Sequence, residues 1–292
     1  MNHKSGFVNI LGFPNVGKST IMNAMVGEKL SIITSKAQTT RHRIMGIVNG
    51  DDFQIVYSDT PGIMKPKYKL QESMMSFVDL ALTDADIILY VTDVKEGVSD
   101  DTGYTQKIRD SGIPVVVAVN KIDLSNQDEL EQVCSGWREM FPGSPVIPVS
   151  GLEKFNLDTL LNAIISLLPA GEPYFPKDQL TDKYERFFAS EIIREKILLN
   201  YQKEIPYCSE VEIESFAEEA KIIRIRALIH ITRESQKGII IGHKGEKLKK
   251  TGREARIDME DFFGKKVFLE LYVKVTKDWR EKPRELKRFG YR

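Results

Sequence analysis

Two patterns of hydrophobic positions divide the chain into an N-terminal and a C-terminal part. Over the first 165 residues, short runs rich in β-branched residues alternate with helix-like segments, which predicts an α/β domain with a mostly parallel sheet. The predicted strands are residues 7–11, 44–48, 53–58, 87–92, 115–120 and 146–149. A polar or glycine-containing turn follows each strand end, and open α/β sheets bind their ligands at such turns.

The C-terminal part has a different order of elements. Three prolines and a glycine within residues 168–176 end the last helical pattern of the α/β part and predict a linker. The elements predicted after it are a helix at 183–201, strands at 208–216 and 222–232, a helix, a glycine turn, a helix at 246–262 and a strand at 267–275. This order is α-β-β-α-α-β. We therefore divide the chain into domain 1–168, linker 169–180 and domain 181–292.

Charge also separates the two parts, although the chain as a whole is neutral. The 292 residues include 42 Lys and Arg and 42 Asp and Glu. Residues 221–292 hold 21 of the basic residues and 10 of the acidic ones, so this segment carries +11 and the remainder −11. A basic segment on an acidic body indicates that only the C-terminal part contacts a polyanion, which excludes a general DNA-coating protein.

Composition narrows the class of protein further. A hydrophobic content of 41% excludes disorder throughout the chain. The longest apolar stretches reach about half of the roughly 20 residues that a membrane-spanning helix needs, and residues 1–5 lack the apolar core of a signal peptide. Cys134 and Cys208 are too few for a disulfide framework or a metal site, so both are interpreted as core residues. We expect a cytoplasmic protein.

A phosphate-binding motif follows the first predicted strand. Residues 12–19 fit the pattern G-x-x-x-x-G-K-[ST] and lead into a helical pattern, which is the required context. Backbone N–H groups of such a loop surround phosphate oxygens, Lys18 adds a point charge, and Ser19 would hold Mg²⁺. The alternative is a purely structural glycine turn, but it does not explain the full pattern. The predicted phosphate-site residues are Gly12, Phe13, Pro14, Asn15, Val16, Gly17, Lys18, Ser19 and Thr20.

Two further motifs follow later strands. Asp59-Thr60-Pro61-Gly62 places a Walker-B-type aspartate after the strand 53–58, with the Gly62 amide able to approach the γ-phosphate, although a surface turn has the same composition. Asn120-Lys121-Ile122-Asp123 offers a carboxylate that accepts two hydrogen bonds from guanine, a pairing that adenine cannot make. Ser150 and Gly151 stand where a further guanine-contacting loop is expected. A solvated turn would suit Asp123 but does not explain three motifs at successive strand ends.

The order of these motifs resembles the translation-factor-related GTPases, and the whole chain resembles the Era family of bacterial ribosome-assembly GTPases. The effector loop of that family is similar to residues 36–43 here, which implies that Thr40, or as second choice Thr39, completes the Mg²⁺ shell. A mobile polar loop is the plainer interpretation, and both hold if the loop orders only with γ-phosphate and Mg²⁺. The implied catalytic residues are Lys18, Thr40 and Gly62. The implied metal ligands are Ser19, Thr40 and, through a water, Asp59.

Three positions bear on how this GTPase would work. Ile63 stands where Ras-like enzymes have a water-orienting glutamine, so hydrolysis should be slow alone, within a decade or two of about 10⁻⁴ s⁻¹. The resemblance implies a potassium ion at Asn15, whereas a residue that caps a turn would look the same. Gly151 replaces the alanine usual after the serine, which leaves the guanine contact of that loop open.

A glycine turn in the basic segment completes the resemblance. Residues 242–245 read G-x-x-G, and with the element order they resemble the type II KH domain at this end of the Era family. Such a loop clamps about four nucleotides of single-stranded RNA. The predicted RNA-binding residues are Ile241, Gly242, His243, Lys244, Gly245, Lys247 and Lys250. A solvated basic helix is the alternative, and the +11 charge on both sides of the turn favours RNA. Ile239, Ile240 and Ile241 would line the groove, with at least two of them in the core.

The end of the chain allows two interpretations. His230 lies in a strand-like run and is interpreted as a sheet-face residue rather than a ligand. Residues 277–292 mix basic and aromatic side chains, as RNA-contacting segments do. A helix that packs Trp279 and Phe289 on the KH core would have the same composition.

The resemblance implies a GTP-hydrolysing switch that binds small-subunit ribosomal RNA near its 3′ end and acts in small ribosomal subunit biogenesis. The implied cofactors are GTP or GDP, Mg²⁺ and K⁺, and we expect a monomer. One alternative is an RNA-binding assembly scaffold whose nucleotide sets affinity. Another is a membrane-associated cell-cycle switch at the inner face of the cell membrane, for which the sequence offers no anchor.

Overall fold

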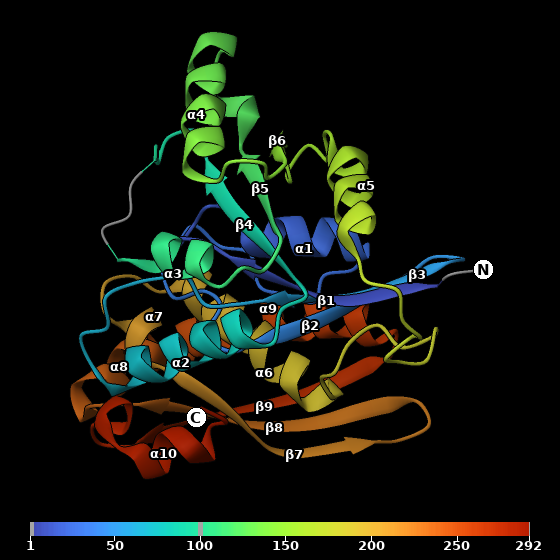
Figure 1. Cartoon of the computed structure of the whole chain (residues 1–292). Coiled ribbons are helices and arrows are strands. Elements are labelled where there is room, and N and C mark those ends of the chain that lie inside the picture. The colour runs from blue at the N-terminus through green and yellow to red at the C-terminus, as the bar shows by residue number, and fades with distance from the viewer. Residues whose placement is uncertain (1–2, 99–101, 292) are drawn as a thin grey trace. The chain divides into compact units, whose positions relative to one another are not determined.

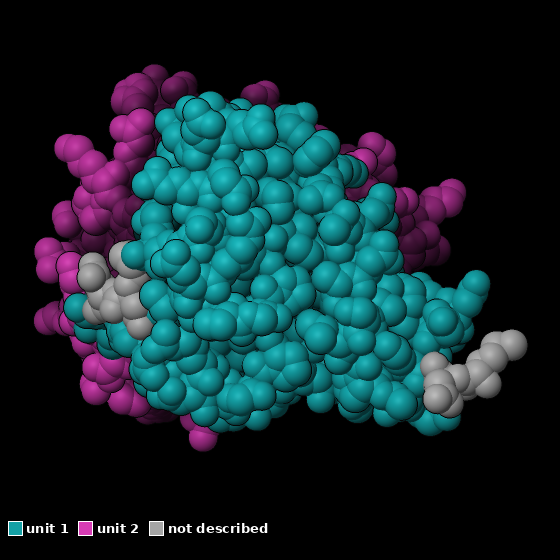
Figure 2. Space-filling model, turned by 45° about the horizontal axis from the view of Figure 1, so that its top comes forward, with its two compact units in different colours: residues 1–66, 74–182 teal, residues 67–73, 183–292 magenta. Residues whose placement is uncertain are grey.

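The computed structural model describes residues 3–98 and 102–291, which form two compact units (Figure 2). Unit 1 comprises the residues up to 66 together with 74–182, and unit 2 comprises residues 67–73 and 183–291. The first two residues of the N-terminal segment 1–5 and the last residue of the basic tail, Arg292, lie outside the described residues.

Unit 1 is built on a six-stranded sheet with the order β2-β3-β1-β4-β5-β6 (Figure 1). Its strands are β1 (Lys4–Leu11), β2 (Ile44–Asn49), β3 (Phe53–Asp59), β4 (Ile87–Asp93), β5 (Val115–Asn120) and β6 (Val146–Pro148). Among the strands that the structure describes in this sheet, β2 alone pairs antiparallel, with β3. The predicted α/β fold with a mostly parallel sheet is therefore confirmed.

The helices of this part of the chain alternate with the strands. They are α1 (Lys18–Val26), α2 (Lys69–Thr83), α3 (Tyr104–Asp110), α4 (Gln127–Met140) and α5 (Leu157–Leu167). Every residue of β4 and β5 is buried, which explains why these strands read as continuous apolar runs rather than alternating ones. β1 lies between β3 and β4, so the later strands are added on both sides of it. The carboxyl end of β1 is therefore the topological switch point, where open α/β sheets bind their ligands.

Aromatic packing fills the core beside α4. Trp137 is fully buried, with its ring centroid 5.0 Å from that of Tyr90 and 6.1 Å from that of Phe141. Cys134 lies in the same cluster, and its thiol is buried and free. The helix begins after Asn126, whose side chain accepts a hydrogen bond from the backbone N–H of Glu129.

The predicted linker packs on unit 1. The backbone N–H of Ser5 donates to the carbonyl of Pro169 at 3.1 Å, and the side-chain amide of Gln54 donates to the carbonyl of Phe175 at 2.8 Å. The hydroxyl of Thr181 donates to the carbonyl of Met45 at 2.7 Å. The first compact unit extends to residue 182, and the domain boundaries at 168 and 181 stay a prediction.

Unit 2 has the order α-β-β-α-α-β of a type II KH domain, as predicted. Its elements are α6 (Glu185–Asn200), α7 (Ile205–Cys208), β7 (Glu210–Glu218), β8 (Ile222–Ile231), α8 (Glu234–Ile241), η2 (His243–Gly245), α9 (Glu246–Phe263), β9 (Lys266–Val275), η3 (Trp279–Glu281) and α10 (Pro283–Arg288). The sheet order is β7-β8-β9, with β8 antiparallel to β7 and parallel to β9. The predicted strand start at 208 is wrong, because Pro206 opens the short helix α7 there.

The tail packs on unit 2 through its aromatic residues. Trp279 is fully buried, and its indole N–H donates to the carbonyl of Cys208 at 2.9 Å. The ring of Phe289 lies 5.5 Å from that of Trp279 and 4.8 Å from that of His230. Leu286 is also buried. Of the two interpretations of the tail, packing on the KH core accounts for these residues.

Acid should weaken this tail packing. His230 is buried between Glu212 and Thr276, at 2.8 and 2.7 Å, and burial lowers its pKa although Glu212 opposes the change. Burial opposes ionisation of Glu212, but hydrogen bonds from Arg288 and His230 lower its pKa overall. Both lowered pKa values mean that the unfolded chain binds more protons below pH 6.5, so stability is lost as pH falls.

We therefore expect the free energy of unfolding to be lower at pH 5 than at pH 7. Urea unfolding at both pH values, followed by Trp279 fluorescence in a Trp137→Phe background, measures this change. His230→Gln should reduce the difference between the two pH values, because the group that takes up a proton is gone. An undiminished difference in that variant would contradict the assignment to His230.

Candidate nucleotide and RNA sites

The loop between β1 and α1 is shaped by contact with a second motif. Gly17 has a φ of 96°, and a Cβ there would stand 2.1 Å from the side-chain nitrogen of Asn120. Only glycine fits, because the conformation is left-handed and Asn120 occupies the space. That nitrogen donates to the carbonyl of Val16 at 2.8 Å, so the structure joins the first and third motifs directly.

Lys18 is held against its own loop. It is 6% exposed, and its ammonium group donates to the carbonyls of Gly12 and Phe13 at 3.0 and 2.7 Å. Burial lowers its pKa to about 8, although the carboxylates of Asp59 and Glu96 favour the charged form. A buried ammonium whose charge is incompletely compensated is suited to bind an anion such as phosphate.

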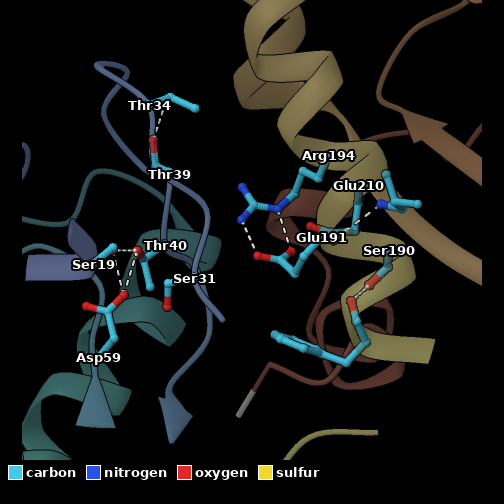
Figure 3. Close-up of polar contacts among 12 residues, drawn as sticks. Ser19, Ser31, Thr34, Thr39, Thr40, Asp59, Ser190, Glu191, Arg194 and Glu210 are labelled. Carbon is cyan, nitrogen blue, oxygen red and sulfur yellow. Dashed lines mark hydrogen bonds and ion pairs between the residues drawn. The ribbon is translucent and has the colours of Figure 1, made fainter. Parts of the chain in front are cut away.

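The oxygen-bearing side chains of Ser19, Thr40 and Asp59 converge (Figure 3). The hydroxyl of Ser19 donates to Oδ2 of Asp59 at 2.6 Å and lies 3.0 Å from Oγ1 of Thr40, which in turn donates to the same Oδ2 at 3.3 Å. Asp59 is fully buried, and burial raises its pKa. Among the described residues, no group hydrogen-bonds its Oδ1. A buried carboxylate with two hydroxyls is a hard-oxygen donor set that fits Mg²⁺.

The structure distinguishes between the two candidate threonines. The hydroxyl of Thr39 lies 2.6 Å from that of Thr34 and donates to the carbonyl of Lys36 at 2.6 Å (Figure 3). It therefore serves the loop itself, whereas Thr40 meets Ser19 and Asp59. Two adjacent threonines cannot be told apart in sequence, because their side chains point in different directions only after the loop folds.

The guanine motif is tied to the loop after β6. The backbone N–H of Gly151 donates to Oδ1 of Asn120 at 2.9 Å, and the hydroxyl of Ser150 donates to Oδ1 of Asp123 at 2.6 Å. Asp123 is exposed, as a base-reading carboxylate must be. A Cβ on Gly151 would stand 3.0 Å from Cγ1 of Ile21, so glycine relieves a tight contact at this position.

A cavity of about 310 Å³ lies over the phosphate loop. Its lining comes from residues 14, 15 and 17–20, from most of residues 32–40, and from Gly62 and Lys121. Gly62 approaches the loop closely, since a Cβ there would stand 2.7 Å from the backbone of Pro14. Asp123 and Ser150 are not part of this lining, so the cavity corresponds to the phosphate end of the predicted site.

Asp93, which no sequence motif indicated, also belongs to this site. Lys121 forms an ion pair with Asp93 at 2.7 Å and donates to the carbonyl of Asn15 at 2.6 Å. Asp93 therefore positions the lysine that supports the phosphate loop. The rule that ligand-site residues follow buried strands would have found it, because it ends β4. Asn15 has a left-handed φ of 67°, which asparagine tolerates well.

The glycine turn of unit 2 presents its basic side chains to solvent. Gly242 has a φ of 73°, and a Cβ there would stand 2.8 Å from Cβ of Lys247. The predicted RNA-binding side chains that are exposed are His243, Lys244, Lys247 and Lys250. The expectation that at least two of the three isoleucines serve the core is wrong. Only Ile240 is fully buried, because the helix turns Ile239 outward, where it is 44% exposed.

A buried hydroxyl fixes the helices on both sides of this turn. Tyr201 is 2% exposed and donates to the carbonyl of Ile240 at 2.7 Å. It also lies 3.3 Å from the hydroxyl of Thr251, on the opposite helix α9. Tyr201 therefore holds together the end of α8 and the helix α9, which flank the turn. The glycines and basic residues of the turn are thereby held on one surface.

The fold and these two sites define a P-loop GTPase joined to a KH domain. A family model described as a 50S ribosome-binding GTPase matches residues 7–121, and a KH domain model matches residues 204–280. The GTPase Era of Syntrophus aciditrophicus is 47% identical over 99% of this chain and 95% of its own. That of Alkaliphilus metalliredigens is 45% identical over the full length of both chains. The chain belongs to the Era family of GTPases.

Solved structures agree with this assignment. A structure of Era in complex with MgGDPNP and nucleotides 1506–1542 of 16S ribosomal RNA matches with a TM-score of 0.95 and 39% identity, over 99% of each chain. A structure of a variant of Aquifex aeolicus Era bound to GDP·AlF₄⁻ also matches with a TM-score of 0.95, at 40% identity over 99% of each chain. Within the described ranges, none of the helices has the length and apolar character required to cross a membrane.

Proposed function

We propose that this GTPase is a switch that binds GTP with Mg²⁺ and binds small-subunit ribosomal RNA near its 3′ end during small-subunit assembly. The observation that carries the proposal is the meeting of Ser19, Thr40 and Asp59, because it connects the nucleotide site to residues 32–40. The exposed basic glycine turn and the related Era–RNA complex support the RNA partner.

The residues act on phosphate mainly by position and charge. Lys18 places its ammonium group against the β- and γ-phosphates, and the N–H groups of the loop surround them. Mg²⁺, when bound, neutralises charge on the phosphate oxygens. Ser19, Thr40 and Asp59 would hold it, with Asp59 acting through a water. The Gly62 amide would donate to the γ-phosphate, and Thr40 would be held through Mg²⁺, so loss of that phosphate would release the segment that contains Thr40.

Intrinsic hydrolysis should be slow. Ile63 is 1% exposed, and its backbone N–H donates to the carbonyl of Gly12 at 3.0 Å. An apolar, buried side chain cannot orient an attacking water by a hydrogen bond. This observation also favours the second candidate function, an RNA-binding scaffold whose nucleotide sets affinity while turnover is too slow to matter.

Hydrolysis rates under four conditions distinguish the switch from the scaffold. We expect a rate within a decade or two of about 10⁻⁴ s⁻¹ in NaCl without RNA, with acceleration by KCl or by a ribosomal 3′-end oligonucleotide. Potassium at Asn15 would supply charge at the phosphates. Asn15→Gly, which removes the side chain and tolerates the left-handed backbone, should then remove only the KCl effect. Equal rates in all four conditions would eliminate coupling and leave the scaffold.

The proposal also includes a monomer in the cytoplasm. Light scattering of the purified chain measures the mass. Sedimentation with anionic vesicles tests the alternative of peripheral association with the inner face of the membrane, and recovery of the chain with the vesicles would support that alternative.

A further inference from the structure

One face of the sheet in unit 2 carries exposed rings and arginines. Side chains of a strand alternate between the two faces, and on β8 the residues Ile223, Ile225 and Ala227 are buried in the core. Arg224 and Arg226 lie between them and are exposed on the opposite face. This outer face is therefore formed by side chains that the core does not need.

The neighbouring strand β9 adds two aromatic rings to this face. Phe268 and Tyr272 are each 46% exposed. The guanidinium of Arg224 lies 5.5 Å from the ring centroid of Phe268, and that of Arg226 lies 5.5 Å from the ring centroid of Tyr272. Phe268 and Tyr272 are four positions apart on the strand, which separates them by about 13 Å. Each ring can therefore stack with a different ring of a ligand. We call these four residues the outer-face platform.

The residues around the platform leave its rings open and pair its arginines with carboxylates. On β7 the positions opposite Arg224 and Arg226 are Ala217 and Ser215, which are too small to cover the rings. Lys274 is exposed near the end of β9. It lies two residues after Tyr272, so it is on the same face of the sheet. The arginines form ion pairs with Glu219 at 2.9 Å, Glu270 at 3.5 Å and Glu214 at 3.7 Å. Exposed pairs of this kind are weak, so a phosphate can replace the carboxylates.

We propose that the outer-face platform is a second RNA-binding surface, on which two unpaired bases stack on Phe268 and Tyr272 while Arg224 and Arg226 contact the adjoining backbone. Exposed aromatic rings on an open sheet bind unpaired bases because every base has a π-face. A protein partner would favour a continuous apolar patch, whereas these rings are separated and each lies beside a cation. The proposal rests on the proposed RNA partner but not on the glycine turn.

The test uses the full chain with the glycine turn disabled by His243→Asp and Lys244→Asp. Binding of a uridine-rich single-stranded RNA of about 12 nucleotides is measured by fluorescence anisotropy. Stacking on one aromatic ring is worth about 1–3 kcal/mol, so we expect about a tenfold loss of the residual affinity for each of Phe268→Ser and Tyr272→Ser. Phe268→Tyr and Tyr272→Phe keep the rings and should keep the affinity.

Crosslinking provides a second readout that does not depend on affinity. RNA with 5-iodouridine should form adducts within residues 266–275 of both the intact chain and the turn-disabled chain. Unchanged affinity in the Phe268→Ser, Tyr272→Ser double variant, or adducts confined to residues 237–250, would overturn the platform. If the intact chain does not bind a ribosomal 3′-end oligonucleotide, the proposed function fails, while a loss of uridine-rich RNA affinity specific to the ring variants would still support the platform. If the intact and turn-disabled chains bind that oligonucleotide equally, only the assignment of the glycine turn fails.

Discussion

Asp123→Asn is expected to weaken GTP binding by about 10²–10⁴-fold. The carboxylate accepts two hydrogen bonds from guanine, and each bond to a charged group is worth about 1.5–3 kcal/mol. An amide keeps one acceptor and adds a donor that faces the amino group of guanine, so both bonds are disturbed. The measurement is the dissociation constant for GTP, GDP and ATP by competition against a fluorescent nucleotide.

Xanthosine triphosphate provides the matched control. It carries a carbonyl where guanine carries the amino group, so the amide of the variant can donate to it. The Asp123→Asn variant should therefore bind xanthosine triphosphate more tightly than the unmodified chain does. If its preference for GTP over ATP were unchanged, base recognition by Asp123 would be refuted.

Replacing His243 and Lys244 with Asp should lower the affinity for a ribosomal 3′-end oligonucleotide by more than about 100-fold. Both side chains are exposed at the glycine turn, where they would lie beside the sugar-phosphate backbone, and the change replaces attraction by repulsion. The salt dependence of the remaining binding should also become shallower, because fewer counterions are released. Nucleotide affinity should stay unchanged, because the substitutions are confined to unit 2.

A variant of the tail with a similar change in net charge controls for general electrostatic repulsion of RNA. Lys282 and Arg284 are exposed near the start of α10, and changing both to Asp alters the net charge at least as much. RNA affinity should then fall much less than in the turn variant. Equal losses in the two variants would show that general charge, rather than the turn, binds RNA. That result would also restore the interpretation of the tail as an RNA contact.

The sequence was sufficient for most of the fold because the relevant signals are local. A β-branched run such as 115–120 favours a strand wherever it lies, and Gly17 with Lys18 fits a loop whose geometry is set by neighbouring peptide units. The strand predicted at 208–216 is present but begins at Glu210, because the proline at 206 favours a short helix before it. The prediction that at least two of the isoleucines 239–241 serve the core is wrong, because three equally hydrophobic residues in a row do not indicate which side of the helix faces the core.

By itself, the sequence determined the α/β and KH folds, three nucleotide motifs at successive strand ends, and the separation of +11 from −11. These follow from the order and spacing of residues along the chain. Only the tertiary structure decided that Thr40 rather than Thr39 meets Asp59, that Asn120 joins the phosphate loop to Gly151, and that Phe289 of the tail packs on His230. Such contacts depend on which side chains of distant segments come within hydrogen-bond or van der Waals distance, and that is fixed only when the whole unit packs.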